Sequence, residues 1–170
     1  MRGRLIVDDP DEFQESYQAD ERVHGTAMAS LILHGELDDN LKPLSRPLYV
    51  RPILKPNRDT RDNPPPECIP DDVLPVDLLH RAVRRMFAGS GTSGPVAPTV
   101  KVINLSVADA ARPFSRIISP WARLLDWLSY EYKVLFIVSA GNYVEDIVFD
   151  GIEHVLRMPK DQLSEEVLKC

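Results

Sequence analysis

The most constraining feature of this sequence is a long apolar run at residues 133–142, K-V-L-F-I-V-S-A-G-N. A strand with one face in water alternates apolar and polar residues, and this run shows no such alternation between Val134 and Val138. Strands of parallel sheets have this composition, because crossover helices cover both of their faces. The run therefore predicts a strand that is buried on both sides within an α/β fold.

Strand and helix patterns alternate along the chain before this run. Pro52 predicts an edge position or an early end for one of the strands, because proline has no N–H to donate. Ser119 and Pro120 supply an N-cap and a first helical residue. The alternation predicts right-handed crossovers and a three-layer α/β sandwich with a mostly parallel sheet. Strands are expected at 4–8, 47–54 and 100–107, and helices at 24–34, from Pro75 and from Pro120.

Two connecting segments are expected to be irregular. Residues 55–74 carry five prolines and eight charged residues, a composition that predicts an inserted loop without helix or strand. Residues 89–95, G-S-G-T-S-G-P, are interpreted as a flexible turn. Residues 143–170 are interpreted as an extension that ends in a cut-off helical pattern. The expected organisation is one partial domain, residues 1–170, of a longer protein.

The charge balance and the hydropathy restrict the partners that we expect. Twenty basic and 26 acidic residues give a net charge of −6, which does not favour a nucleic-acid surface. The basic residues Arg81, Arg84 and Arg85 are interpreted as the solvated face of a helix. No apolar run reaches the length needed to span a membrane. We therefore expect neither nucleic acid nor a membrane as partner, and the oligomeric state stays open.

The titratable and sulfur-containing residues predict no metal ion or other cofactor. Cys68 and Cys170 form no disulfide framework and no metal-binding spacing. The acidic residues Glu36, Asp38 and Asp39 lack the ligand spacing of a calcium loop. Two unpaired thiols, together with an N-terminus that lacks a signal-peptide pattern, favour a cytoplasmic location.

Three polar segments are placed where an α/β protein carries its chemistry. The segment that begins at His24, H-G-T-A-M-A-S-L-I-L-H-G, is apolar or small on every side, so it predicts a fully buried helix. Such a helix holds the His24 ring rigidly, as a general base requires. The segments N-L-S-V-A-D (104–109) and S-A-G-N (139–142) follow two predicted strands, at the carboxyl edge of the sheet.

These segments, in this order, resemble the histidine, substrate-binding and oxyanion blocks of the subtilisin-like serine peptidases. The resemblance implies a subtilisin-like fold that is incomplete at both ends, and peptide-bond hydrolysis by a Ser-His-Asp triad. It implies that His24 is the general base and that Asn142 donates a hydrogen bond to the oxyanion. It also implies that Ser106, Val107 and Ala108 bind an extended peptide or unfolded protein as an added strand.

The chain departs from the pattern of this family in its other catalytic residues. Asp8 is a poor substitute for the triad aspartate, which we expect before residue 1. The only Gly-Thr-Ser, residues 91–93, precedes Asn142 and lies in the flexible turn, where no nucleophile is held rigidly. Val107 and Ala108 replace the usual Leu-Gly. We therefore expect this chain to be inactive as a peptidase on its own.

Two other interpretations remain open. A non-catalytic, peptidase-like module that binds peptides or partner domains fits the missing serine and the Val107-Ala108 pair. An unrelated nucleotide-binding α/β domain is disfavoured, because the sequence contains no G-x-G-x-x-G between strand and helix and no G-x-x-x-x-G-K.

Overall fold

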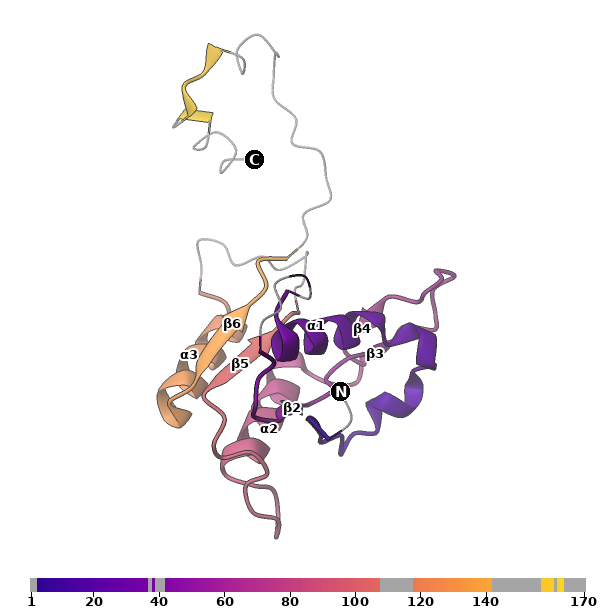
Figure 1. Cartoon of the computed structure of the whole chain (residues 1–170), viewed down its shortest axis with the longest axis vertical. Coiled ribbons are helices and arrows are strands. Elements are labelled where there is room, and N and C mark those ends of the chain that lie inside the picture. Colours follow the sequence, from indigo (N-terminus) through magenta and orange to yellow (C-terminus); the bar gives the residue numbers. More distant parts are fainter. Residues whose placement is uncertain are drawn as a thin grey trace.

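The computed structural model describes residues 3–36, 38, 42–107, 118–141, 157–160 and 162–163. Within these residues the chain is a mixed α/β protein with short parallel strand pairs, as the alternating pattern predicts (Figure 1). Its α-helices are α1 (Val23–His34), α2 (Pro75–Phe87) and α3 (Pro120–Tyr132), and two short 3-10 helices, η1 (Phe13–Ser16) and η2 (Ala19–Glu21), precede α1.

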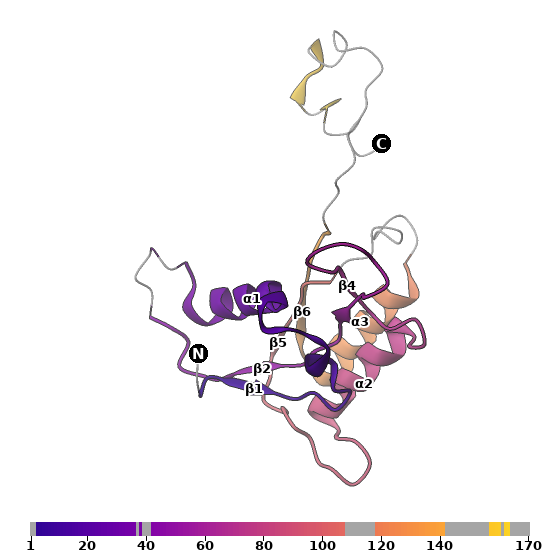
Figure 2. The same ribbon diagram turned by 90° about the vertical axis from the view of Figure 1, so that its right-hand side faces the viewer.

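The strands form separate two-stranded ladders in the described part of the chain, not one continuous sheet. Strand β1 (Leu5–Val7) pairs in parallel with β2 (Leu48–Val50), and β5 (Val102–Leu105) pairs in parallel with β6 (Leu135–Val138). The two pairs confirm the predicted parallel connections. Figure 2 shows α1 on one side of β5 and β6, and α2 and α3 together on the other side.

The predicted absence of strands in residues 55–74 is wrong. Strand β3 (Lys55–Pro56) pairs antiparallel with β4 (Glu67–Cys68), and the N–H of Asn57 donates to the carbonyl of Pro66 at 2.7 Å. Each strand of this ladder has only two residues, so it needs few N–H donors. Proline lacks an N–H, but its presence does not prevent so short a pairing. The prolines therefore limit the length of these strands without preventing their pairing.

The ends of α2 and α3 follow directly from the sequence. Pro75 occupies the first turn of α2, and Pro120 that of α3. The hydroxyl oxygen of Ser119 accepts a hydrogen bond from the N–H of Ala122 at 3.1 Å, which satisfies a donor that the first turn leaves free. Both predicted helix starts are confirmed.

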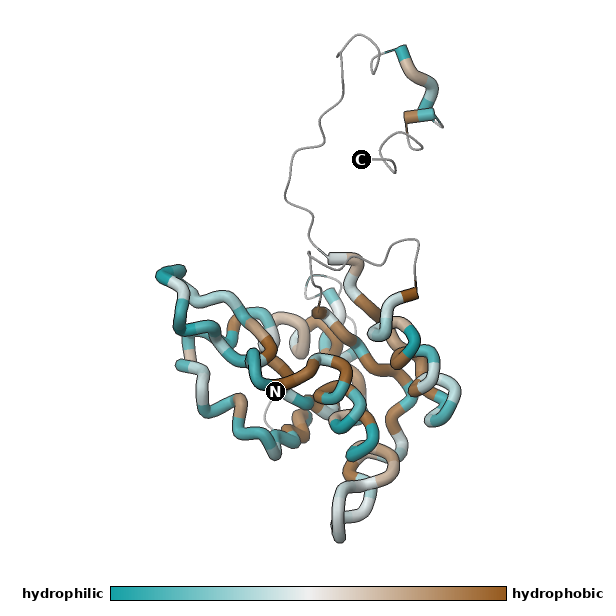
Figure 3. Tube along the Cα trace, turned by 180° about the vertical axis from the view of Figure 1, so that it is seen from behind, coloured by the Kyte–Doolittle hydropathy of each residue, from teal (hydrophilic) through white to brown (hydrophobic). Residues whose placement is uncertain are grey.

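The main core lies between the helical pair α2–α3 and the inner face of β5–β6. It is a cluster of buried aliphatic residues: Leu79, Val83, Leu105, Leu125 and Leu128. Apolar stretches gather in the middle of the molecule while the outer loops are hydrophilic, as Figure 3 shows. Burial of these side chains is what fixes the helices on the strands.

The prediction that the helix from His24 is fully buried is wrong. Only Ala29 and Leu33 of α1 are buried, whereas Val23 and Leu31 are exposed. The helix is apolar on every side, yet within the described chain only one side of its C-terminal half is covered. Gly35 ends the helix as predicted, with φ 69° and its N–H bonded to the carbonyl of Leu31.

The prediction that both faces of residues 133–142 are buried is also wrong for the part that forms β6. Phe136 and Val138 pack against the core, whereas Leu135 and Ile137 are 60% and 52% exposed. The apolar run is therefore covered on one face only by the described elements. None of the helices in that part of the chain is long and apolar enough to cross a membrane.

Candidate functional site

The predicted general base, His24, lies in the first turn of α1 with its side chain 58% exposed. Its Nδ1 is 3.8 Å from Oε2 of Glu67, and Oε1 of Glu67 accepts a hydrogen bond from the hydroxyl of Tyr17 at 2.6 Å. Burial, and then the hydrogen bond to Glu67, raise the pKa of Tyr17 above its usual value. A carboxylate from β4 therefore lies near the ring but beyond hydrogen-bond distance, and the sequence pattern did not indicate this neighbour.

The residues predicted to bind a peptide lie at the end of β5. The side-chain amide of Asn104 donates to the hydroxyl of Ser106 at 2.8 Å, and Val107 packs against the core cluster. Ala108 and Asn142 lie outside the described residues. Within the described chain, no hydrogen bond or ion pair joins His24 to Ser106. The roles assigned to His24, Asn142, Ser106, Val107 and Ala108 stay predictions.

Asp8, the poor substitute for a triad aspartate, is bound through its carboxylate by Arg85 and Tyr49. Nε of Arg85 donates to Oδ2 of Asp8 at 2.9 Å and Nη2 donates to Oδ1 at 3.0 Å, while the hydroxyl of Tyr49 donates to Oδ2 at 2.7 Å. The guanidinium of Arg85 is the main cause that lowers the pKa of Asp8 below 3.8. A carboxylate that is bound in this way is a structural anchor between β1, β2 and α2.

The same cluster continues through Asp11. This carboxylate forms ion pairs with Arg51 and with Arg81, whose Nη1 lies 3.1 Å from Oδ1. Arg51 also donates from Nη1 to the backbone carbonyl of Asp8, but its buried Nε has no partner among the described residues. The interpretation of Arg81 and Arg85 as a merely solvated helix face is therefore wrong, because acidic residues far along the chain bind them.

Arg84 differs from its neighbours Arg81 and Arg85. It is exposed, and within the described residues no ion pair engages it. It lies one turn after His80 on the side of α2 that faces α3. Among the described residues, no group of three His, Cys, Asp or Glu side chains is arranged to hold a metal ion.

An aromatic cluster fills the seam between α2 and α3 beside Arg84. The ring of Trp127 contacts His80 edge-on at 5.6 Å and Tyr132 edge-on at 6.4 Å between centroids, and Tyr132 stacks on Phe87 at 4.9 Å. Trp127 is still 46% exposed. This surface was missed from the sequence, because Trp127 and Tyr132 are five residues apart, a spacing that does not mark one face of a helix. We call His80, Arg84 and Trp127 the aromatic–basic surface.

The chain is similar to a DNA repair protein. It is 31% identical over 78 residues to "DNA excision repair protein ERCC-6-like" of Danio rerio. The match covers 44% of this chain and 5% of that protein, so the chain spans a small part of its length. No family model and no solved structure matches the chain.

This similarity corrects the assignment to the subtilisin-like serine peptidases. The relative is a DNA excision repair protein, and no comparison links the chain to a peptidase. The expected peptide-bond hydrolysis, the serine-protease class and a peptide substrate are therefore withdrawn. The expectation that nucleic acid is not a partner is contradicted as well. That expectation rested on the net charge of the chain. The net charge sums ion-paired residues such as Asp8 and Arg85 together with Arg84, for which the described residues show no ion pair.

Proposed function

We propose that this chain contacts single-stranded nucleic acid through the aromatic–basic surface of α2 and α3. The observation that carries the proposal is a Trp127 ring that is half exposed and held edge-on by His80 and Tyr132. Proteins that bind single strands combine aromatic rings, on which bases stack, with cations that contact the phosphates. The similarity to a DNA excision repair protein supports this class of partner.

The geometry of the surface suits stacking because the ring is already oriented. Rings that make edge contacts with two neighbours have little rotational freedom left to lose when a base stacks on them. His80 and Arg84 lie one turn apart on α2, beside Trp127 of α3. Arg84, one turn from the residue that contacts Trp127, is the cation that we propose for a phosphate of a strand whose base covers Trp127.

The neighbouring acidic residue limits the strength of this site. Glu131 lies one turn after Trp127 on α3 and is exposed, so its carboxylate repels a phosphate near Trp127.

In our proposal the surface occupies the outer helical layer of the three-layer α/β sandwich that the sequence predicts. Binding through one ring and one cation, in a chain of net charge −6, is weak and sensitive to salt.

The direct test is the fluorescence anisotropy of a labelled 20-nucleotide single strand titrated with the full chain at low salt. Loss of the stacking ring in Trp127→Ala should weaken binding about tenfold, since one base–aromatic stack contributes about 1–3 kcal/mol. Arg84→Ala should also weaken it, and Glu131→Gln should strengthen it.

Matched controls come from elements outside α2 and α3. Ile6 of β1 is an apolar residue that is 52% exposed, and Arg61, between β3 and β4, is an exposed arginine. Ile6→Ala and Arg61→Ala should therefore leave the affinity unchanged. Absence of binding by the wild-type chain, or an equal loss in the controls, would show that this surface is not the site.

A further inference from the structure

His80 is the residue of the aromatic–basic surface whose type changes charge near neutral pH. Its ring lies 5.6 Å from the ring of Trp127 between centroids, and the residue is partly exposed on α2. The phenol ring of Tyr132 also contacts Trp127, from the same helix as Trp127. Histidine side chains ordinarily gain a positive charge between about pH 8 and pH 5. A proton on His80 therefore places a positive charge beside the ring that we propose for stacking.

The acidic residues of the described chain leave such a charge without a partner. No ion pair engages His80 there, whereas Nδ1 of His24 has Oε2 of Glu67 at 3.8 Å. On α2 itself, Asp77 lies one turn before His80, and its carboxylate pairs with Arg81 at 3.2 Å. The carboxylate one turn away is therefore already engaged by another cation.

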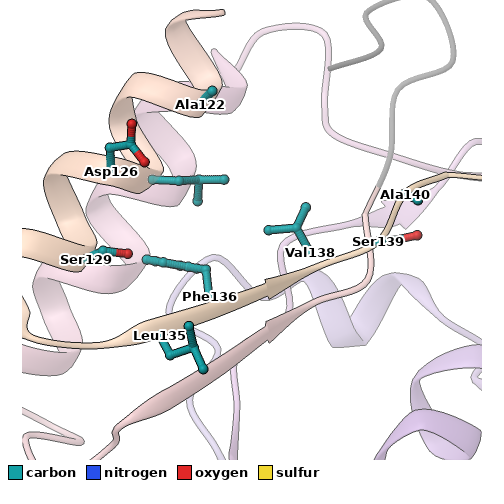
Figure 4. Close-up of a pocket in the computed structure, with 9 residues that line it drawn as sticks. Ala122, Asp126, Ser129, Leu135, Phe136, Val138, Ser139 and Ala140 are labelled. Atoms are coloured by element: carbon teal, nitrogen blue, oxygen red, sulfur yellow. The ribbon is translucent and has the colours of Figure 1, made fainter. Parts of the chain in front are cut away.

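Helix α3 carries charges of both signs around Trp127. Arg123 lies one turn before Trp127 and Glu131 one turn after it, and both are exposed. Asp126, next to Trp127 in the sequence, instead lines the groove between α3 and β6 (Figure 4). The cation and the anion within one turn of Trp127 oppose each other in their effect on a proton at His80.

Arg84 opposes the charged form of His80 in the free chain. It lies four residues after His80 on α2 and is exposed, and two positive charges at this spacing repel each other. A phosphate between the two side chains attracts both and so offsets this repulsion. Binding of a phosphate and uptake of a proton by His80 therefore favour each other, and this coupling is reciprocal.

We propose that protonated His80 is a phosphate-binding residue of the aromatic–basic surface, so that single-stranded nucleic acid binds more tightly as the pH falls from 8 to 5.5. This inference rests on the proposed function, because the strand brings the phosphate to the surface. The charge on His80 lies 5.6 Å from the Trp127 ring, within about one Debye length, about 10 Å at 0.1 M salt, of the phosphate of a nucleotide stacked there. At pH 8 Arg84 holds the phosphate, and at pH 5.5 His80 joins it.

The affinity of the full chain for a labelled strand of 20 thymidine nucleotides, measured by fluorescence anisotropy at pH 8 and at pH 5.5, tests this inference. Thymine bases do not change charge in this range, so the strand itself stays the same. We expect about fivefold tighter binding at pH 5.5 in 0.1 M salt, the gain from one phosphate contact on a single strand. The slope of log K against log salt should also steepen by about 0.7.

Substitutions of His80 separate its charge from its contact with Trp127. His80→Gln should bind equally at both pH values, because its amide gains no charge. A merely structural role in holding Trp127 would instead lower the affinity and leave the pH dependence in place. His80→Arg keeps a planar cation at every pH, so at pH 8 it should bind as tightly as the wild type does at pH 5.5. His24→Gln is the matched control, and it should keep the pH dependence.

The outcomes distinguish this inference from the proposed function. Equal affinity of the wild type at pH 8 and pH 5.5 would overturn the inference while nucleic-acid binding stands. A pH dependence that His80→Gln retains, or that His24→Gln abolishes, would do the same. Absence of binding at both pH values would overturn the proposed function and this inference with it. Circular dichroism at both pH values confirms that each variant is folded.

Discussion

Asp8 is the residue whose surroundings yield the sharpest prediction for stability. Its carboxylate accepts hydrogen bonds from Nε and Nη2 of Arg85 and from the hydroxyl of Tyr49, and its side chain is largely buried. Asp8→Asn removes the charge but keeps the shape, so we expect a loss of about 1.5–3 kcal/mol in the free energy of unfolding. Urea denaturation followed by circular dichroism measures it.

The control for this substitution is a carboxylate in an exposed pair. Asp77 lies one turn before Arg81 on α2 and pairs with it at 3.2 Å. Asp77→Asn should cost only about 0.3–0.5 kcal/mol, as is usual for such helix pairs. A loss as large as that of Asp8→Asn would show that burial of the Asp8 cluster does not decide the difference.

The same group predicts how stability depends on pH. Arg85, with Tyr49 and Arg51, holds the pKa of Asp8 in the folded chain below the value of 3.8 expected for an unperturbed aspartate. The stabilisation is therefore complete above pH 3.8 and is lost as the pH falls through the folded value. Unfolding curves of the wild type between pH 5 and pH 2 should converge with those of Asp8→Asn. Parallel curves throughout this range would contradict the assignment.

Which of these residues the sequence could predict depends on the distance along the chain. Ser119 and Gly35 act on neighbours within four residues, so their capping roles could be predicted from the local pattern. Asp8 and Arg85 are 77 positions apart, and only folding brings them together. His24 and Glu67 are joined in the same way. The partners that decide each site's chemistry therefore could not be deduced from local spacing.

Helix α3 offers a test of a local signal. The Ser119 hydroxyl satisfies the N–H of Ala122 at its start, and Ser129 lies in its interior, away from this N-terminal cap. Ser119→Ala should lower the free energy of unfolding by about 1 kcal/mol, because that N–H loses its acceptor. Ser129→Ala should change it little or raise it slightly, since alanine favours a helix interior. Equal effects in urea denaturation would show that the cap contributes nothing.

The elements themselves were easier to predict than the faces that they bury. Periodicity and capping residues located α1, α2 and α3, and apolar runs located β1, β2, β5 and β6. The same signals failed for exposure, because an apolar surface on α1 or β6 does not indicate what covers it. Burial is decided by the partners of an element, and within the described residues these two elements have partners on one side only.

The net charge misled the prediction of partners because it sums over charges that are already neutralised. Arg51, Arg81 and Arg85 are engaged by acidic residues, whereas Arg84 has no ion pair within the described part of the chain. A chain of net charge −6 still repels a polyanion as a whole. Attraction at one surface and repulsion over the rest of the molecule therefore act together on any nucleic-acid strand.

This balance predicts how oligonucleotide binding responds to salt. If Arg84 is the cation that contacts a phosphate, log K should fall with log salt, and Arg84→Ala should make the slope shallower by about 0.7, the value for one phosphate on a single strand. Trp127→Ala should lower the affinity without changing the slope, since stacking releases no counterions. Anisotropy titrations between about 20 and 200 mM salt separate the two effects. A slope that Arg84→Ala leaves unchanged and Arg123→Ala reduces would move the phosphate contact to Arg123, one turn before Trp127 on α3.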